Sequence, residues 1–254
     1  MSHARWRCTS ATRCAAESGL TSEKRVALVG HTPDGYASEP LTTHQQERRH
    51  VFLLSPANAS GARASLLTAP ESQSELAQRL RGPGVPLGEL FAFISSLYFR
   101  GKLTYATRFA VAPNGAEGVH IITPSAGLLP PHMTVTMEQF REFIAEPVHA
   151  ENQGYRIPLE RDVRKLLAAL DDETDVVLLG SIASPKYVAP LSAILGKRLL
   201  FPSEFVGRGD MSRGGLLLRC VRAQEPLNYA RVIDAVKSGP RTPKLPPAPK
   251  TKES

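Results

Sequence analysis

The stretch VVLLGSIASPKYV, residues 176–188, decides how the chain is expected to fold. It opens with an all-apolar run, which is typical of a strand covered on both faces. A loop of small residues follows, and Pro185 then suits the first turn of a helix whose cap is Ser184. A strand, a short polar loop and a helix in this order indicate an α/β unit with a parallel sheet.

The same unit recurs on both sides of this stretch. Apolar runs at residues 51–54, 119–123 and 197–201 predict further strands, and residues 216–221 fit either a strand or a helix. Helical patterns occupy the segments between the strands, at residues 72–81, 87–99, 101–109, 137–144 and 158–170. The sequence therefore predicts an α/β fold of three layers, in which helices flank a mostly parallel central sheet.

Only the central part of the chain shows this alternation. Residues 1–48 lack a sustained pattern and residues 237–254 are rich in Pro and Lys, so we expect disordered N- and C-terminal tails. Residues 49–236 then make a single α/β domain, which is large enough for a substantial hydrophobic core.

The net charge of +7 on 254 residues favours an anionic partner such as nucleic acid or a nucleotide. Residues 237–254 contain five Lys and Arg against one Glu, so more than half of this charge lies in the expected tail. The three cysteines make no disulfide framework, and no apolar run is long enough to span a bilayer. We therefore expect a cytoplasmic protein with no membrane partner.

Polar, glycine-containing loops follow the predicted strands, where an open α/β sheet usually binds its ligand. The segment FPSEFVGRGDMSRGGLLLR, residues 201–219, places glycines among arginines. Glycine lets the backbone approach a ligand closely and Arg binds phosphate in a fork, so this segment suits an anion. The predicted ligand-binding residues are Ser55, Arg63, Ser125, Gly127, Ser181, Arg208, Ser212, Arg213 and Gly214.

Several common motifs do not occur in the sequence. There is no phosphate loop, no GxGxxG after a strand, no GxSxG, no HExxH and no Cys pair with zinc spacing, so no cofactor or metal is expected. His132 fits either an acid/base group near the sheet edge or a surface loop residue. Aromatic and basic residues interleave at residues 98–108, as on a nucleic-acid-binding face or on an ordinary amphipathic helix.

Several stretches resemble the YaaA-type peroxide-stress proteins and a related bacterial domain family of unknown function. LLSPANASG at residues 53–61 is similar to the ISPAKT segment of the YaaA-type family, and residues 178–188 and 212–221 resemble its LASNEYF and KKARGLMARYI segments. HIITPSAGLLPPHMTV at residues 120–135 resembles its LSGLYGVLRPLD and the second family's ILSAKYGLVPPD. LYFRGKLTYATRFA at residues 97–110 looks like the second family's LY-x-FRGRRAYAERF. The order of strands and loops also resembles the uracil-DNA glycosylase superfamily.

The resemblance implies an α/β fold with a positively charged cleft, DNA binding and a role in limiting oxidative damage. The chain departs from the YaaA-type pattern where Asn58 replaces a lysine and where Asp210 and Met211 replace paired lysines, so a charge suited to phosphate is missing at both places. By position the resemblance points to Ser55, Pro56, Ala57 and Asn58, to Gly127 and Leu128, and to Ser212, Arg213 and Gly214.

The first hypothesis for function is therefore the binding of DNA or a nucleotide in a cleft formed by these loops. Arg63, Arg208 and Arg213 would contact phosphates, and Ser55 and Asn58 would contact base or sugar.

Two alternatives remain open from the sequence. The protein could hydrolyse an N-glycosidic bond in a nucleoside or nucleic acid, with Asn58 orienting water and Asp210 or Glu204 stabilising positive charge on the sugar. It could instead be a non-enzymatic scaffold whose glycines serve only turns.

Overall fold

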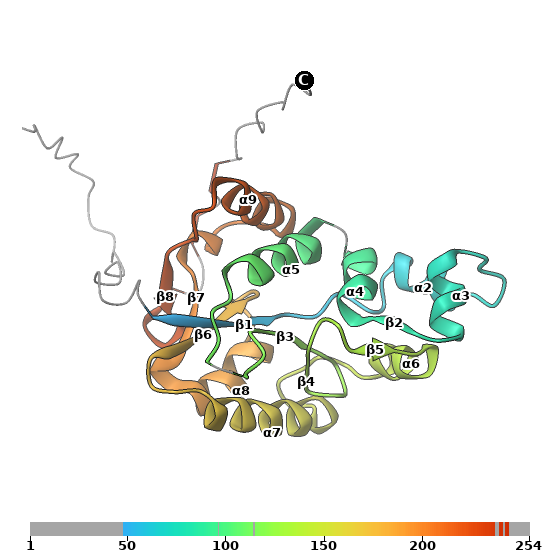
Figure 1. Cartoon of the computed structure of the whole chain (residues 1–254), viewed down its shortest axis with the longest axis horizontal. Helices are drawn as coiled ribbons and strands as arrows, with labels where there is room; N and C mark the ends of the chain where they lie inside the picture. The colour runs from blue at the N-terminus through green and yellow to red at the C-terminus, as the bar shows by residue number, and fades with distance from the viewer. Residues whose placement is uncertain (1–47, 96, 114, 237–238, 241, 244–254) are drawn as a thin grey trace, which may run out of the picture. The chain divides into compact units, whose positions relative to one another are not determined.

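The sheet at the centre of the fold has six strands in the order β4-β3-β1-β6-β7-β8, with helices on both faces (Figure 1). The predicted α/β class with a mostly parallel sheet is therefore confirmed. The predictions made for residues 1–47 lie outside the residues that the structure describes. This structure is a computed structural model, and it describes residues 48–95, 97–113, 115–236, 239–240 and 242–243.

The four inner strands run parallel, and each outer strand runs antiparallel to its neighbour. The inner strands are β1 (Arg49–Leu54), β3 (Val119–Ile122), β6 (Thr174–Leu179) and β7 (Leu199–Pro202). The outer strands are β4 (Leu128–Leu129) and β8 (Tyr229–Arg231). A separate antiparallel pair consists of β2 (Val85–Pro86) and β5 (Thr134–Val135).

Helices form the outer layers of the fold (Figure 1). α5 (Leu97–Phe109) and α9 (Asp210–Ala223) lie on one face of the sheet, and α7 (Gln153–Ala169) and α8 (Pro185–Leu195) lie on the other. Beyond the carboxyl ends of the parallel strands lie α2 (Ala62–Thr68), α3 (Glu75–Arg81), α4 (Leu87–Ser95) and α6 (Met137–Ala145). Short 3-10 turns occur at Gly196–Arg198, Ser203–Phe205 and Val232–Asp234.

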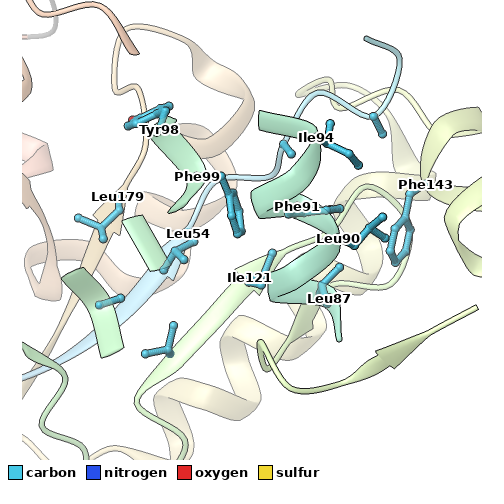
Figure 2. Close-up of a cluster of buried hydrophobic side chains, with 14 of the residues drawn as sticks. Leu54, Leu87, Leu90, Phe91, Ile94, Tyr98, Phe99, Ile121, Phe143 and Leu179 are labelled. Atoms are coloured by element: carbon cyan, nitrogen blue, oxygen red, sulfur yellow. The ribbon is translucent and has the colours of Figure 1, made fainter. Parts of the chain in front are cut away.

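The inner strands are covered on both sides, and alternate residues enter two separate cores. In β1, Phe52 and Leu54 belong to the core beneath α5, whereas Val51 and Leu53 belong to the core beneath α7 and α8. Figure 2 shows part of the first core, with Leu54 from the sheet and Phe99 from α5. Burial of a side chain such as Phe52 stabilises the fold by about 1.5–3 kcal/mol. The two cores therefore hold the three layers together.

The connections after β1 and β6 leave the sheet toward opposite faces. The chain after β1 leads to α5 before it enters β3, and the chain after β6 leads to α8 before it enters β7. Because β1 and β6 are neighbours, their carboxyl ends flank a crevice, which is where open α/β sheets bind ligands.

Several boundaries differ from the prediction. α7 begins directly after Asn152, whose side chain accepts a backbone hydrogen bond from the first turn at 3.1 Å, so Pro158 lies inside the helix and not at its start. α4 ends at Ser95 and α5 begins at Leu97, so Gly101 lies inside α5. Residues 216–221 belong to α9 and are helical.

Part of the predicted C-terminal tail is bound to the domain. The backbone N–H of Thr242 donates to the carbonyl of Gly207 at 3.2 Å, and its hydroxyl donates to the carbonyl of Val206 at 3.3 Å. Residues 239–240 and 242–243 therefore continue the folded region past the boundary expected at residue 236.

α5 and α9 cross at two glycines, Gly101 and Gly214. A Cβ atom on Gly101 would lie 2.8 Å from the carbonyl oxygen of Gly214, and a Cβ on Gly214 would lie 2.9 Å from the carbonyl oxygen of Leu97. Both distances are shorter than packed atoms allow, so the crossing requires glycine on each helix. Gly214 was predicted to bind phosphate, and the structure assigns it to this helix contact instead.

Replacement of Gly101 by Ala is expected to lower the free energy of unfolding by about 1–3 kcal/mol, because the added methyl group forces the two helices apart. Alanine is the better helix former by about 1 kcal/mol, so propensity alone predicts the opposite sign. Urea unfolding of the variant measures the change. The matched control is Thr104→Ala at an exposed position of α5, and equal stability of the two variants would contradict the close crossing.

Candidate functional site

A cavity of about 650 Å³ opens at the carboxyl ends of β1, β3 and β6. The strand-end loops line it with Ser55, Pro124 and Ser181. Opposite them, Phe143 of α6 and Glu146 of the loop after α6 also line the cavity. The structure thus brings together the loops after three of the four parallel strands, and the loop after β7 does not line this cavity.

Ser55 and Gly180 hold the two central loops against each other. The N–H of Ser55 donates to the carbonyl of Leu179 at 3.2 Å, which continues the pairing of β1 with β6 by one residue. A Cβ atom on Gly180 would lie 3.0 Å from the Cβ of Ser55, so a larger residue there would push the loops apart. Ser55 is 5 % exposed and lies on the cavity wall.

Lys102 of α5 lies directly beneath Ser55 and is 1 % exposed. Its ammonium nitrogen, Nζ, is 2.9 Å from Ser55 Oγ and 2.5 Å from the Ser55 carbonyl oxygen. The same nitrogen lies 4.6 Å from the centre of the Tyr98 ring and 4.9 Å from that of Phe99. A lysine buried to this extent is uncommon in a protein core, and here two oxygen atoms and two ring faces surround its terminal nitrogen.

Burial lowers the pKa of Lys102 to about 7, because a charged group is destabilised away from water. Two nearby charges act in opposite directions on this pKa: the carboxylate of Asp210 raises it and the guanidinium of Arg213 lowers it. The two acceptor oxygens of Ser55 and the ring faces favour the ammonium form. Lys102 is therefore placed to exchange a proton near neutral pH.

Tyr98 also lines the cavity, and it is 7 % exposed. Its buried hydroxyl makes no hydrogen bond within the described part of the chain. Burial raises the pKa of Tyr98 to about 12, and the nearby Arg213 guanidinium partly offsets this rise. The guanidinium of Arg213 can only donate to this hydroxyl, so the O–H donor of Tyr98 is left for a ligand in the cavity.

Among the described residues, the charged side chains that line the cavity are Lys186, Asp210 and Glu146. Lys186 lies in the first turn of α8, where its ammonium is 5.1 Å from the centre of the Tyr187 ring. Asp210 is exposed and forms a 3.5 Å ion pair with Arg213. Asn58 completes the rim, and its side-chain oxygen accepts hydrogen bonds from the N–H and the hydroxyl of Ser60.

The predicted phosphate-binding arginines do not line this cavity. Arg208 and Arg213 line a separate hollow of about 200 Å³, and their guanidinium groups donate to the carbonyls of Glu204 and Phe205. Arg63 lies on α2 and donates to the carbonyl of Phe93 at 3.0 Å. These guanidinium groups were expected to bind a ligand, and in the fold they donate hydrogen bonds to backbone carbonyl oxygens.

The other predicted residues are divided between the cavity and the rest of the fold. Ser55, Asn58, Ser181 and Asp210 line the cavity. Gly127 has a φ of +72° and packs against α7, where a Cβ atom would lie 2.6 Å from the carbonyl oxygen of Pro158.

Three predicted residues do not line the cavity. Glu204 accepts hydrogen bonds from Asn228 and does not line the cavity, so it is not placed for the assigned role on a sugar. Ser212 lies on α9 beside Arg208. Ser125 is adjacent to Pro124, and its buried hydroxyl makes no hydrogen bond within the described residues.

His132 is exposed and lies 3.8 Å from Glu117, in a different hollow of the surface. This position favours the surface-loop interpretation over an acid/base role at the sheet edge. Cys220 is half-buried, packs against the first core and forms no disulfide within the part of the chain that the structure describes.

Lys102 and Tyr98 were not predicted from the sequence as parts of the site. The sequence does contain a signal for these two residues, because Tyr98, Lys102 and Tyr105 are spaced four and three residues apart and therefore share one face of a helix. That face is the buried one, as Tyr105 shows with 0 % exposure. A lysine on an apolar stripe needs a polar partner, and here the partner is Ser55, 47 positions earlier in the chain.

Comparisons of the chain with protein-family models, with curated proteins and with solved structures gave no match. The resemblance described from the sequence therefore stays a prediction. None of the described helices has the length and apolar character needed to cross a membrane. Within the described ranges, no three His, Cys, Asp or Glu side chains are grouped in a way that would hold a metal ion.

Replacement of Lys102 by Met is expected to change how stability depends on pH. The folded protein releases the lysine proton near pH 7, whereas an unfolded lysine keeps it to about 10.5. Between these values the unfolded state binds more protons, so wild-type stability gains up to about 1.4 kcal/mol per pH unit from Lys102 as pH rises.

The Lys102→Met variant lacks this gain. Urea unfolding of both proteins at about pH 7, 8.5 and 10 should therefore show a difference that grows in favour of the wild type. Lys186→Met, at a half-exposed lysine on the same cavity, is the matched control. Parallel stability curves for wild type and Lys102→Met would contradict a pKa near 7.

Proposed function

We propose that the cavity binds a nucleotide, either free or as a single residue of a DNA strand. The observation that supports this most directly is the position of the cavity at the crevice between β1 and β6, with hydroxyl, amide, aromatic and cationic groups in one lining. A volume of about 650 Å³ lies within the range of small-molecule sites and suits one nucleotide.

The phosphate is proposed to bind at the start of α8. The N-cap residue Ser184 makes no side-chain hydrogen bond to the first turn, and Pro185 has no N–H to contribute. The N–H groups of the next two residues, Lys186 and Tyr187, have no acceptor within the helix, and both residues line the cavity. The positive end of the helix and the Lys186 ammonium together favour an anion.

The base and sugar are proposed to occupy the part of the cavity near Tyr98 and Asn58. The side-chain oxygen of Asn58 already accepts from Ser60, so its NH2 group would donate to the nucleobase edge, and the buried Tyr98 hydroxyl offers a further partner. The exposed carboxylate of Asp210 can accept a hydrogen bond from a sugar hydroxyl.

Replacement of Lys186 by Ala is expected to weaken nucleotide binding about fivefold to tenfold or more, because one charge-assisted contact is worth about 1–2 kcal/mol. Titration calorimetry with nucleoside monophosphates and short single-stranded DNA, at about 50 mM and 200 mM salt, measures the change. Lys250→Ala removes the same charge from the C-terminal segment and serves as the control. Equal losses in the two variants would contradict binding in the cavity.

Hydrolysis of an N-glycosidic bond is a second candidate function, and one observation favours it. Asp210 and Asn58 line the same cavity, so a carboxylate and an amide that could orient water belong to one site. The carboxylate would stabilise positive charge that develops on the sugar as the bond breaks.

Release of free base from a panel of nucleosides and damaged DNA tests this second function. If Asp210 stabilises the transition state, Asp210→Asn should lower the rate by about a hundredfold or more. Glu204→Gln, which alters a carboxylate outside the cavity, should leave the rate unchanged. An Asp210→Asn protein with full activity would remove the residue from the mechanism.

The resemblance to peroxide-stress proteins would place this binding activity in the response to oxidative damage, in the cytoplasm. Survival of cells that lack the gene, after exposure to hydrogen peroxide, tests that setting separately from the binding experiment.

A further inference from the structure

Ser55 separates the cavity from a buried amine. Its side chain lies on the cavity wall and its hydroxyl oxygen is 2.9 Å from Lys102 Nζ. This distance lies within the range at which a base takes a proton from a nucleophile, about 2.6–3.2 Å. The proposed binding of a nucleotide does not depend on the contact between Ser55 and Lys102.

We propose that Ser55 is a nucleophile toward the carbonyl carbon of an ester or amide, and that Lys102 is the base that takes its proton. The pair would act as a serine–lysine dyad, in which an amine serves in place of an imidazole.

The contacts of Lys102 suit a base because they fix its position and exclude water. The Ser55 carbonyl oxygen accepts a hydrogen bond from Nζ at 2.5 Å, which orients the nitrogen toward the hydroxyl of the same residue. The rings of Tyr98 and Phe99 cover the nitrogen on other sides. A nucleophile and a base oriented by a third group are the arrangement that serine catalysis requires.

The protonation state of Lys102 agrees with this arrangement. A pKa lowered to about 7 by burial leaves a substantial fraction of the amine neutral at neutral pH. Asp210 and Arg213 are the charged groups that act on it, with opposite signs, and the neutral phenol of Tyr98 lies beside it. A neutral amine can donate one hydrogen to the carbonyl of Ser55 while its lone pair accepts the hydroxyl proton.

The proposed step balances without any added oxidant or cofactor. Ser55 Oγ forms a bond to the carbonyl carbon while its proton moves to Lys102 Nζ. The tetrahedral intermediate then breaks the bond to the leaving group, which takes the proton from Nζ and departs as an alcohol or amine. Water repeats the sequence on the acyl-serine, releases the carboxylic acid and restores both side chains.

The loop after Ser55 supplies hydrogen-bond donors for the oxyanion of this intermediate. The backbone N–H groups of Ala57 and Asn58 have no acceptor within the described part of the chain, and both residues line the cavity. Donors fixed before the reaction stabilise a developing negative charge. An ester carbonyl is uncharged, so its entry meets no repulsion from the carboxylates of Glu146 and Asp210 in the same lining.

The test treats the full chain with a fluorophosphonate, which traps activated serines, between about pH 5.5 and pH 9.5 and without any nucleotide. Mass spectrometry of the digested protein locates the adduct. We expect one adduct on Ser55, formed at a rate that rises with pH around a midpoint near 7. Ser55→Ala should give no adduct there, and Lys102→Met should slow labelling about a hundredfold or more.

Two comparisons keep the outcome decisive. Ser203→Ala alters a serine after β7 that lies outside the cavity, and it should label like the wild type. Lys102→Arg keeps a positive charge but offers no base, and it should label as slowly as Lys102→Met. Absence of an adduct on Ser55 at every pH, or equal labelling rates with and without Lys102, would overturn the dyad. Because no nucleotide is present, either result leaves the nucleotide proposal to be judged on its own experiment.

Discussion

The parallel pairing of β1 with β6 is the constraint on which the rest of the structure depends. The two strands pair along their whole length, from Arg49 opposite Thr174 to Leu54 opposite Leu179. Most of the paired side chains are buried. A slip of one residue would turn each side chain of a strand toward the opposite core, where it does not fit. The register is therefore fixed by packing on two faces, and it places Ser55 beside Gly180 at the end of the pair.

The close crossing of α5 and α9 also determines the surroundings of Ser55, from one face of the sheet. Gly101 sits in that crossing, and the next residue, Lys102, projects beneath Ser55. The first turn of α9 brings Asp210 and Arg213 near enough to shift the pKa of Lys102. The glycine contact, the buried lysine and the charges near it are thus linked through α5 and α9. A change that moves these helices apart should also change the position of Lys102 beneath the cavity.

The sequence predicted the parts of the fold that depend on local patterns. The all-apolar runs identified β1, β3, β6 and β7, because strands covered on both faces are mostly apolar. Strands of two or three residues, such as β4 and β8, carry too little pattern to be recognised. The start of α5 was misplaced for a different reason: the prediction began a helix at Gly101, whereas this glycine lies inside α5 and contacts Gly214 of α9.

The candidate site was predicted in part, and the errors have one cause. Loop residues at strand ends were found because topology alone brings Ser55 and Ser181 to one edge. Arg208 and Arg213 were assigned to a ligand because arginines among glycines suit an anion, whereas in the fold they donate to the carbonyls of Glu204 and Phe205. Lys102 was missed because its partner is distant in the chain. A hydrogen bond between residues far apart in the chain produces no periodic pattern in the sequence.

The charges of the cavity limit what it can recognise. Among the described lining residues, Lys186 is the one cation and Glu146 and Asp210 are carboxylates, so this lining has no excess of positive charge although the chain as a whole is basic. A groove that follows a nucleic-acid backbone needs a series of cations, because its affinity comes from neutralising successive phosphates. A cavity with one cation and one open helix end suits a single phosphate, and it must obtain the rest of its specificity from hydrogen bonds. Recognition of one nucleotide or one acyl group is therefore a better match to this lining than recognition of a duplex.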